Sequence, residues 1–290
     1  MSSVFLRSLV PLLIGCGATG DSTNRPTTQG HPASFVAAPS ATLSPSASSS
    51  PEPPPIAPEP LALFSSEPRV RSLDLPGFQQ AHLVLPRGEG RTKARLAVVA
   101  HGAGERPEPH CDHYGPLLGD EYLLACTRGF PNNSHLPEPE RGYFYDGHHR
   151  LGDELTALFE TLSKTEPFAS GVELNGALYV GFSQGATMGI LALHEEPELA
   201  VRFNGILLVD GGSGEWTVAL AKRMAERNTR VAIVCGNAAC REKAERSRSW
   251  LRHAGLENEM RLSTARHFLG GRLAEDVKSV LPWLLRAEAE

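Results

Sequence analysis

The chain has 290 residues and a formal net charge of -5, with 28 lysines and arginines against 33 aspartates and glutamates. This mild acidity argues against a nucleic-acid-binding protein, which would carry a basic stripe or patch. No internal repeat is visible, and the residues beyond the N-terminal region suffice for one buried core.

Residues 1–15 are predicted to be a lipoprotein signal peptide. One cation, Arg7, precedes an apolar run at residues 9–14 that is too short to remain in a bilayer as a helix. Leu13-Ile-Gly-Cys16 resembles the lipobox of bacterial lipoproteins, which is cleaved before the cysteine, and this implies an acylated Cys16. An ordinary secretory signal is the second interpretation and a chance apolar N-terminus the third. The favoured interpretation places the chain in a bacterial cell envelope, attached to a membrane by lipid.

Residues 16–69 are predicted to be a disordered linker. They hold about half of the 23 prolines, many serines and alanines, and almost no large apolar side chains. Such a segment cannot bury a core, so it is expected to hold a folded domain, residues 70–290, away from the membrane.

Apolar strands that alternate with helical patterns predict a mainly parallel, doubly wound sheet with helices on both faces. The expected strands are residues 95–100, 122–126, 176–180, 204–209, 230–235 and 257–262. An amphipathic helix packed on the sheet is expected before the third of them, because apolar residues recur there at helical spacing. These residues are Leu151, Leu155, Leu158, Phe159 and Leu162.

Two glycine-containing turns follow predicted strands. His101-Gly-Ala-Gly104 comes after the strand at 95–100 and could turn a backbone N–H towards a ligand. Gly181-Phe-Ser-Gln-Gly185 lies between the strand at 176–180 and an apolar helical segment. Its glycines permit a sharp strand-to-helix turn with Ser183 at the apex. Each pattern alone is weak, but the two in this order are much rarer by chance.

From Val70 onward the chain, with both motifs in this order, resembles the α/β-hydrolase superfamily, specifically its small esterase, acyl-thioesterase and dienelactone-hydrolase-like branch. The resemblance implies the α/β-hydrolase fold and a nucleophilic serine at Ser183. It also implies that the backbone N–H groups of Ala103 and Gln184 form an oxyanion hole. The alternative is a pair of βα turns that merely need glycine.

The acid of a catalytic triad is less certain from the sequence. The family resemblance places a carboxylate in the turn after the strand at 230–235, but that turn reads Gly236-Asn-Ala-Ala-Cys240. Asn237 could orient a histidine through its amide oxygen, although an amide cannot stabilise an imidazolium by charge. Asp210, which ends the preceding strand, is the preferred candidate, with a helix-capping role as its alternative. Glu242 is a weaker candidate, because it is expected on a helix that starts after Cys240.

His267 is the expected general base. It lies after the last predicted strand and before a final amphipathic helix, and no other of the eleven histidines has this position. His267-Phe resembles the "GHxF" segment of the family, although Arg266 stands where glycine is usual. A surface histidine without a catalytic role is the alternative.

Four further cysteines suggest two disulfides in an exported protein. Three pairings are possible, and the favoured one joins Cys111 to Cys126 and Cys235 to Cys240. Unpaired cysteines that act as small apolar residues are the alternative.

No metal or cofactor is predicted. The cysteines form no CxxC pair, and His110 and His113 beside Cys111 are too isolated a cluster to imply a closed zinc site.

Together these features predict a serine hydrolase that cleaves a small carboxylic ester or thioester through an acyl-enzyme on Ser183. The alternative is a non-catalytic cell-envelope lipoprotein that uses the fold for binding or scaffolding, favoured by the missing carboxylate after Cys235. Peptidase activity has no supporting residue. The aromatic loop at 142–149 either lines the substrate pocket or packs on the domain. The sequence does not indicate the substrate or the oligomeric state.

Overall fold

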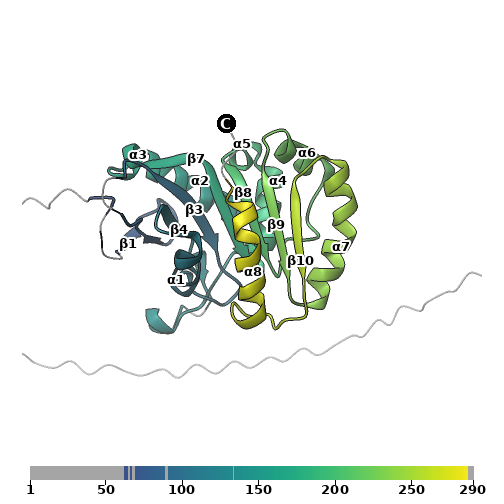
Figure 1. Ribbon diagram of the computed structural model, residues 1–290. Coiled ribbons are helices and arrows are strands. Elements are labelled where there is room, and N and C mark those ends of the chain that lie inside the picture. Colours follow the sequence, from purple (N-terminus) through teal and green to yellow (C-terminus); the bar gives the residue numbers. More distant parts are fainter. Residues whose placement is uncertain (1–61, 65, 67–68, 89–90, 133, 287–290) are drawn as a thin grey trace, which may run out of the picture. The chain divides into compact units, whose positions relative to one another are not determined.

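Figure 1 shows the computed structural model of the chain. The structure describes residues 62–64, 66, 69–88, 91–132 and 134–286. The predicted signal peptide, the predicted lipidation site Cys16 and most of the predicted linker lie outside these residues. Within the described part of the chain, no helix combines the length and apolar composition that a bilayer crossing requires.

An eight-stranded sheet forms the centre of the fold, in the order β1-β2-β4-β3-β7-β8-β9-β10. The first two pairings are antiparallel, and the other five are parallel. The strands are β1 Val70–Leu73, β2 Ala81–Val84, β3 Ala94–Ala100, β4 Tyr122–Cys126, β7 Val172–Phe182, β8 Phe203–Val209, β9 Arg230–Cys235 and β10 Asn258–Leu262. A separate hairpin pairs β5 (Phe130–Pro131) with β6 (Tyr143–Phe144). The mainly parallel sheet that the sequence predicts is confirmed.

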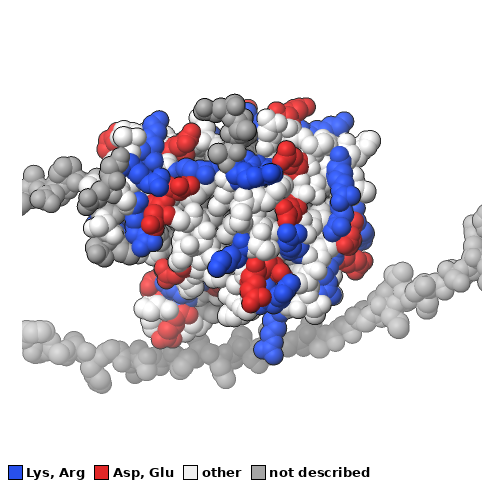
Figure 2. All heavy atoms as spheres, in the orientation of Figure 1, with Lys and Arg blue, Asp and Glu red and all other residues white. Residues whose placement is uncertain are grey.

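Helices cover both faces of this sheet (Figure 1). Helices α1 and α8 lie on one face, and α2, α4, α6 and α7 lie on the other. Their bounds are α1 Pro107–Leu118, α2 His148–Lys164, α3 Phe168–Gly171, α4 Gln184–Glu195, α5 Pro197–Ala200, α6 Val218–Ala225, α7 Ala238–His253 and α8 Gly271–Leu284, and a 3-10 turn spans Glu138–Glu140. On the face shown in Figure 2, acidic and basic side chains are interspersed.

Strand periodicity explains the two hydrophobic layers. Successive side chains of a strand point to opposite faces. In β7, Leu178 and Val180 therefore pack with α1 and α8, whereas Tyr179 packs with the helices of the other face. The apolar residues predicted for the amphipathic helix of residues 151–162 are all buried in α2.

Strand β7 is longer than the sequence predicts. It begins at Val172 rather than at 176, and its pairing with β8 shifts register between Ala177 and Leu178. Gly176 has a φ of +77°, a conformation that glycine adopts without strain. A glycine at an irregularity inside the strand therefore looked, in the sequence, like the start of the strand.

Both favoured disulfides are present in the structure. Cys111 of α1 is joined to Cys126 at the end of β4, with Cα atoms 6.1 Å apart. Cys235 at the end of β9 is joined to Cys240 in the first turn of α7, with Cα atoms 5.4 Å apart. Each bond ties a helix to the carboxyl end of a strand.

Candidate active site

The candidate site lies at the carboxyl ends of the parallel strands. Ser183 follows β7, Asp210 follows β8, and His267 lies in the loop between β10 and α8. The His101–Gly104 turn follows β3, which pairs with β7. Since neighbouring parallel strands end at the same edge of a sheet, residues far apart in the sequence converge there, where open α/β sheets usually bind ligands.

Ser183 occupies a tight turn between β7 and α4. Its φ of +52° lies in the left-handed region that non-glycine residues rarely adopt. A Cβ at Gly181 would approach the Ala186 Cα to 2.5 Å, and a Cβ at Gly185 would overlap the carbonyl oxygen of Ala100. Both motif glycines are therefore required because backbone approaches backbone, and the turn holds the serine in a fixed orientation.

His267 bridges Ser183 and Asp210. Its Nε2 lies 2.8 Å from the Ser183 Oγ, and its Nδ1 lies 2.9 Å from the Asp210 Oδ2. The ring also stacks on Phe182, with centroids 5.0 Å apart and an interplanar angle of 22°. The three polar side chains thus form one continuous line of hydrogen bonds, in the arrangement of a serine–histidine–aspartate triad.

Asp210 is fixed from several sides. Its side chain is fully buried, and its backbone has a φ of +53°. The Oδ1 accepts hydrogen bonds from the backbone N–H groups of Gly236, at 2.7 Å, and Asn237, at 3.0 Å. The turn in which the family resemblance places a carboxylate therefore supplies the N–H donors that orient a carboxylate from the neighbouring strand.

The two alternative acids have other positions. The Asn237 side chain caps α7, because its Oδ1 accepts a hydrogen bond of 2.9 Å from the Cys240 N–H. Glu242 is exposed on α7 and faces Arg246. The helix starts at Ala238, before Cys240 rather than after it. The structure therefore brings Asp210, and neither Asn237 nor Glu242, to the His267 ring.

The two expected oxyanion donors belong to turns that are joined directly. The Gly185 N–H donates a hydrogen bond of 3.0 Å to the carbonyl oxygen of His101. Among the residues that the structure describes, the N–H groups of Ala103 and Gln184 meet no hydrogen-bond acceptor. Both donors are thus free to bind an oxygen atom of a ligand.

The Gln184 side chain has a separate role that the sequence did not indicate. Its Oε1 accepts from the Tyr145 N–H at 2.9 Å, and its Nε2 donates to the Tyr145 carbonyl oxygen at 3.2 Å. Two residues earlier, Tyr143 exchanges backbone hydrogen bonds with Gly104 and Glu105 in the His101–Gly104 turn region. The 143–145 segment therefore connects the serine turn to the glycine turn.

These contacts place the two tyrosines of the aromatic loop at 142–149. Tyr143 and Tyr145 are buried, and the guanidinium groups of Arg106 and Arg128 lie over the Tyr143 ring. The tyrosines therefore pack on the domain and hold the glycine turn.

Two buried titratable groups hold backbone at the glycine turn and at the neighbouring Arg128–Gly129 segment. His101 has its ring nitrogens 2.7 Å and 2.9 Å from the carbonyl oxygens of Gly102 and Arg128, and burial lowers its pKa. Glu154 of α2 accepts hydrogen bonds from the N–H groups of Arg128 and Gly129, and burial raises its pKa to about 7. Both side chains hold backbone segments that support the site. Within the described residues, neither of them forms a hydrogen bond with Ser183, whose Oγ pairs with His267.

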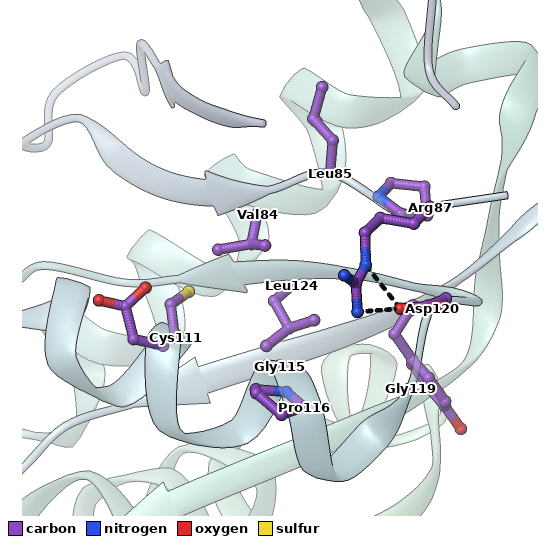
Figure 3. Close-up of a pocket in the computed structure, with 12 residues that line it drawn as sticks. Val84, Leu85, Arg87, Cys111, Gly115, Pro116, Gly119, Asp120 and Leu124 are labelled. Atoms are coloured by element: carbon purple, nitrogen blue, oxygen red, sulfur yellow. Dashed lines mark hydrogen bonds and ion pairs between the residues drawn. The ribbon is translucent and has the colours of Figure 1, made fainter. Parts of the chain in front are cut away.

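A separate cavity of about 190 Å³ lies between β2, β4 and α1 (Figure 3). Leu85, Cys111 and Leu124 contribute to its lining, and Arg87 forms a salt bridge with Asp120 beside it. None of its lining residues belongs to the site around Ser183.

The comparisons with known proteins identify the fold. No protein-family model and no curated protein matches the sequence. Among solved structures, an uncharacterized protein from Bacillus cereus ATCC 10987 matches with a TM-score of 0.52 and 19% identity, over 68% of this chain and 61% of its own. Dienelactone hydrolase from Anabaena variabilis ATCC 29413 matches with a TM-score of 0.50 and 15% identity, over 76% of this chain and 96% of its own. The protein has the α/β-hydrolase fold.

Acylaminoacyl peptidase from Pyrococcus horikoshii shares this fold at a TM-score of 0.53 and 12% identity, over 77% of this chain. The match covers 42% of the peptidase, so the chain spans less than half the length of that protein. Proteins with such different names on one fold illustrate that the substrate has to be inferred from the site.

Proposed function

We propose that the protein is a serine hydrolase that cleaves a carboxylic ester or thioester through an acyl-enzyme on Ser183. The observation that supports this proposal best is the line of hydrogen bonds from Ser183 through His267 to Asp210. The pattern of two motifs in the sequence, described above, supports the choice of ester or thioester.

The proposed reaction has two halves. The Ser183 Oγ attacks the substrate carbonyl while the His267 Nε2 takes its proton, and the N–H groups of Ala103 and Gln184 stabilise the resulting oxyanion. The intermediate collapses, and the alcohol or thiol leaves with the proton from His267. A water molecule then attacks the acyl-enzyme in the same manner, which releases the acid and the free Ser183 hydroxyl.

Ser183→Ala tests this proposal. The variant should lose fluorophosphonate labelling and all turnover across a panel of esters and thioesters of increasing acyl length, while its melting temperature stays near that of the native protein. Ser163→Ala, which removes an exposed hydroxyl in the last turn of α2, is the matched control and should retain labelling. Wild-type protein that neither labels nor turns over any substrate would instead favour the non-catalytic, binding or scaffolding alternative.

We also infer that the protein is exported and attached to a membrane through Cys16. The Leu13–Cys16 pattern supports this inference, as do the two disulfides, since disulfides persist chiefly in oxidising compartments. Intact-mass analysis of protein extracted from membranes should show cleavage before Cys16 and added acyl chains. A mature chain that begins elsewhere would contradict the inference.

A further inference from the structure

Two histidines and a glutamate from different helices meet on the α2/α4 side of the sheet. His148 and His149 are the first residues of α2, and Glu195 is the last residue of α4. One potential ligand atom from each of the three lies within 4.8 Å of the others. The His148 Nε2 is 3.0 Å from the Glu195 Oε1, and the His149 Nδ1 is 2.8 Å from its Oε2.

Neither of these short contacts has the alignment of a hydrogen bond. The His148 Nε2 is a buried nitrogen without a hydrogen-bond partner in the described structure. The two rings lie side by side, with centroids 4.1 Å apart. Two imidazole nitrogens therefore face one carboxylate at ion-pair distance, an arrangement that attracts when the histidines are protonated and that a bound cation would also satisfy.

The helices that carry these residues are closely packed beside the cluster. A Cβ at Gly152 of α2 would overlap the side chain of Glu196, and the Thr156 hydroxyl donates a hydrogen bond of 3.3 Å to the same carboxylate. The absence of a side chain at Gly152 lets α2 approach the end of α4. Helix packing at Gly152 therefore places the beginning of α2 beside the end of α4, in addition to the contacts of the three residues themselves.

The geometry points to a site for a divalent transition-metal ion, and we propose that Zn²⁺ binds to His148, His149 and Glu195. Imidazole nitrogen and carboxylate oxygen are ordinary zinc ligands, and bond lengths near 2.1 Å place neighbouring ligands of a tetrahedral ion about 3.4 Å apart. The two histidine–glutamate separations of 3.0 and 2.8 Å would open by about half an ångström, and the ligand atoms of the two histidines lie within 4.8 Å of each other. The His149 side chain is 70% exposed, which gives it room to move and leaves a path for the ion and a water ligand.

This site is separate from the proposed chemistry. Ser183 and Glu195 lie at opposite ends of α4, whose 12 residues span about 18 Å. A metal ion bound by Glu195 and the two histidines would link the beginning of α2 to the end of α4. It would stabilise the folded chain without contacting the substrate. The sequence did not suggest it, because Glu195 is brought to the histidine pair only by the packing of the two helices.

Calorimetric titration of the full chain without a polyhistidine tag tests the proposal. Zn²⁺ should bind at one ion per chain and raise the melting temperature, since a ligand of the folded state stabilises it. His149→Ala and Glu195→Gln should each weaken zinc binding at least about tenfold, and each should leave ester turnover in metal-free buffer unchanged. Co²⁺ should show the intense visible absorption of a four-coordinate ion in the native protein and lose it in both variants.

Two controls make the result specific. His253→Ala removes an exposed histidine from the last turn of α7 and should bind Zn²⁺ as the native chain does. His267→Ala removes the proposed catalytic base and should also retain the site. The proposal is overturned if His149→Ala and Glu195→Gln bind zinc as tightly as the native protein, or if the native protein shows no binding at one ion per chain.

Discussion

The turn that carries Ser183 and the loop that carries His267 are held in place by different kinds of contact. Around Ser183, backbone lies against backbone, with no space for a Cβ at Gly181 or Gly185. The His267 side chain is 45% exposed, and the neighbouring Phe268 is 65% exposed.

The loop of residues 263–270 is held by a few hydrogen bonds and by Ala265 and Leu269, which pack partly buried against the core. The Ser263 and Ala265 N–H groups bond to the carboxyl end of β9 and the following turn. Arg241 of α7 donates to the carbonyl oxygens of Gly236 and Ser263 and to the Thr264 hydroxyl. Damage to the serine turn should therefore appear as lost stability, whereas damage to the histidine loop should appear mainly as a lower rate.

Among variants that compare the two regions, Asp210→Asn should have the largest effect, because Asp210 contacts both of them. An amide cannot stabilise the imidazolium and favours the wrong tautomer, so kcat should fall by about 10⁴ with little change in melting temperature. Asn237→Ala is the comparison variant. It removes a helix cap, which should lower the free energy of unfolding by about 1 kcal/mol and change kcat little. Equal losses of kcat in both variants would show that Asp210 does not orient the histidine.

Gly185→Ala should destabilise the closely packed turn around Ser183, and the defect should appear as a lower free energy of unfolding. The added Cβ meets the Ala100 carbonyl oxygen, and neither backbone segment can withdraw without disturbing the sheet. The free energy of unfolding should fall by about 3 kcal/mol, measured by denaturant titration. Gly115→Ala in α1, where an added Cβ meets nothing within 4 Å, should leave stability unchanged or raise it. If Gly185→Ala is as stable as the native protein but inactive, the rigidity inferred for the serine turn is wrong.

Glu154 should make the stability of the folded chain depend on pH. Burial raises the pKa of this carboxyl to about 7, above that of an unfolded glutamate near 4.3. The folded state thus holds a proton that the unfolded state releases, and stability is lost as the pH rises from about 4.3 through 7. Glu154→Gln cannot ionise, so its stability relative to the native protein should improve by about 2 to 3 kcal/mol between pH 5 and pH 8. A difference that does not vary with pH would contradict this.

Arg241→Met should have the smallest effect and should act on the histidine loop. It removes the one guanidinium nitrogen that donates to the carbonyl oxygens of Gly236 and Ser263 and to the Thr264 hydroxyl, while keeping much of the side-chain bulk. We expect kcat and the rate of fluorophosphonate labelling to fall together by about tenfold, with a small change in melting temperature. Arg241→Lys should recover part of the rate, because an ammonium can still reach one carbonyl. A large loss of stability at unchanged kcat would show that Arg241 supports the fold and not the position of the histidine loop.

The strands and the catalytic candidates followed from local patterns in the sequence. Runs of apolar residues marked the parallel strands, and turn glycines marked the position of Ser183. The choice between Asp210 and Asn237 was harder, because it depends on which strand end faces His267. The sequence did carry one usable signal, since asparagine directly before a helix is a common N-cap.

Other parts of the site depend on contacts between distant segments. Gln184 was noted for its backbone N–H, but the binding of its side chain to Tyr145 spans 39 residues. Stacking of Phe182 on His267 also has no local signature. Hairpin strands of two residues, β5 and β6, are too short to produce a period-two pattern.

Gly211 has a further consequence for the distance between the serine and the aspartate. It follows Asp210 directly, and a Cβ there would overlap the carbonyl oxygen of Ser183. The ends of β7 and β8 thus touch through main-chain atoms, and no intervening side chain sets their separation. Substitutions of core side chains should therefore have little effect on the distance between the ends of β7 and β8. The alignment of Ser183 with Asp210 is therefore a property of the backbone and should survive extensive divergence of the sequence around it.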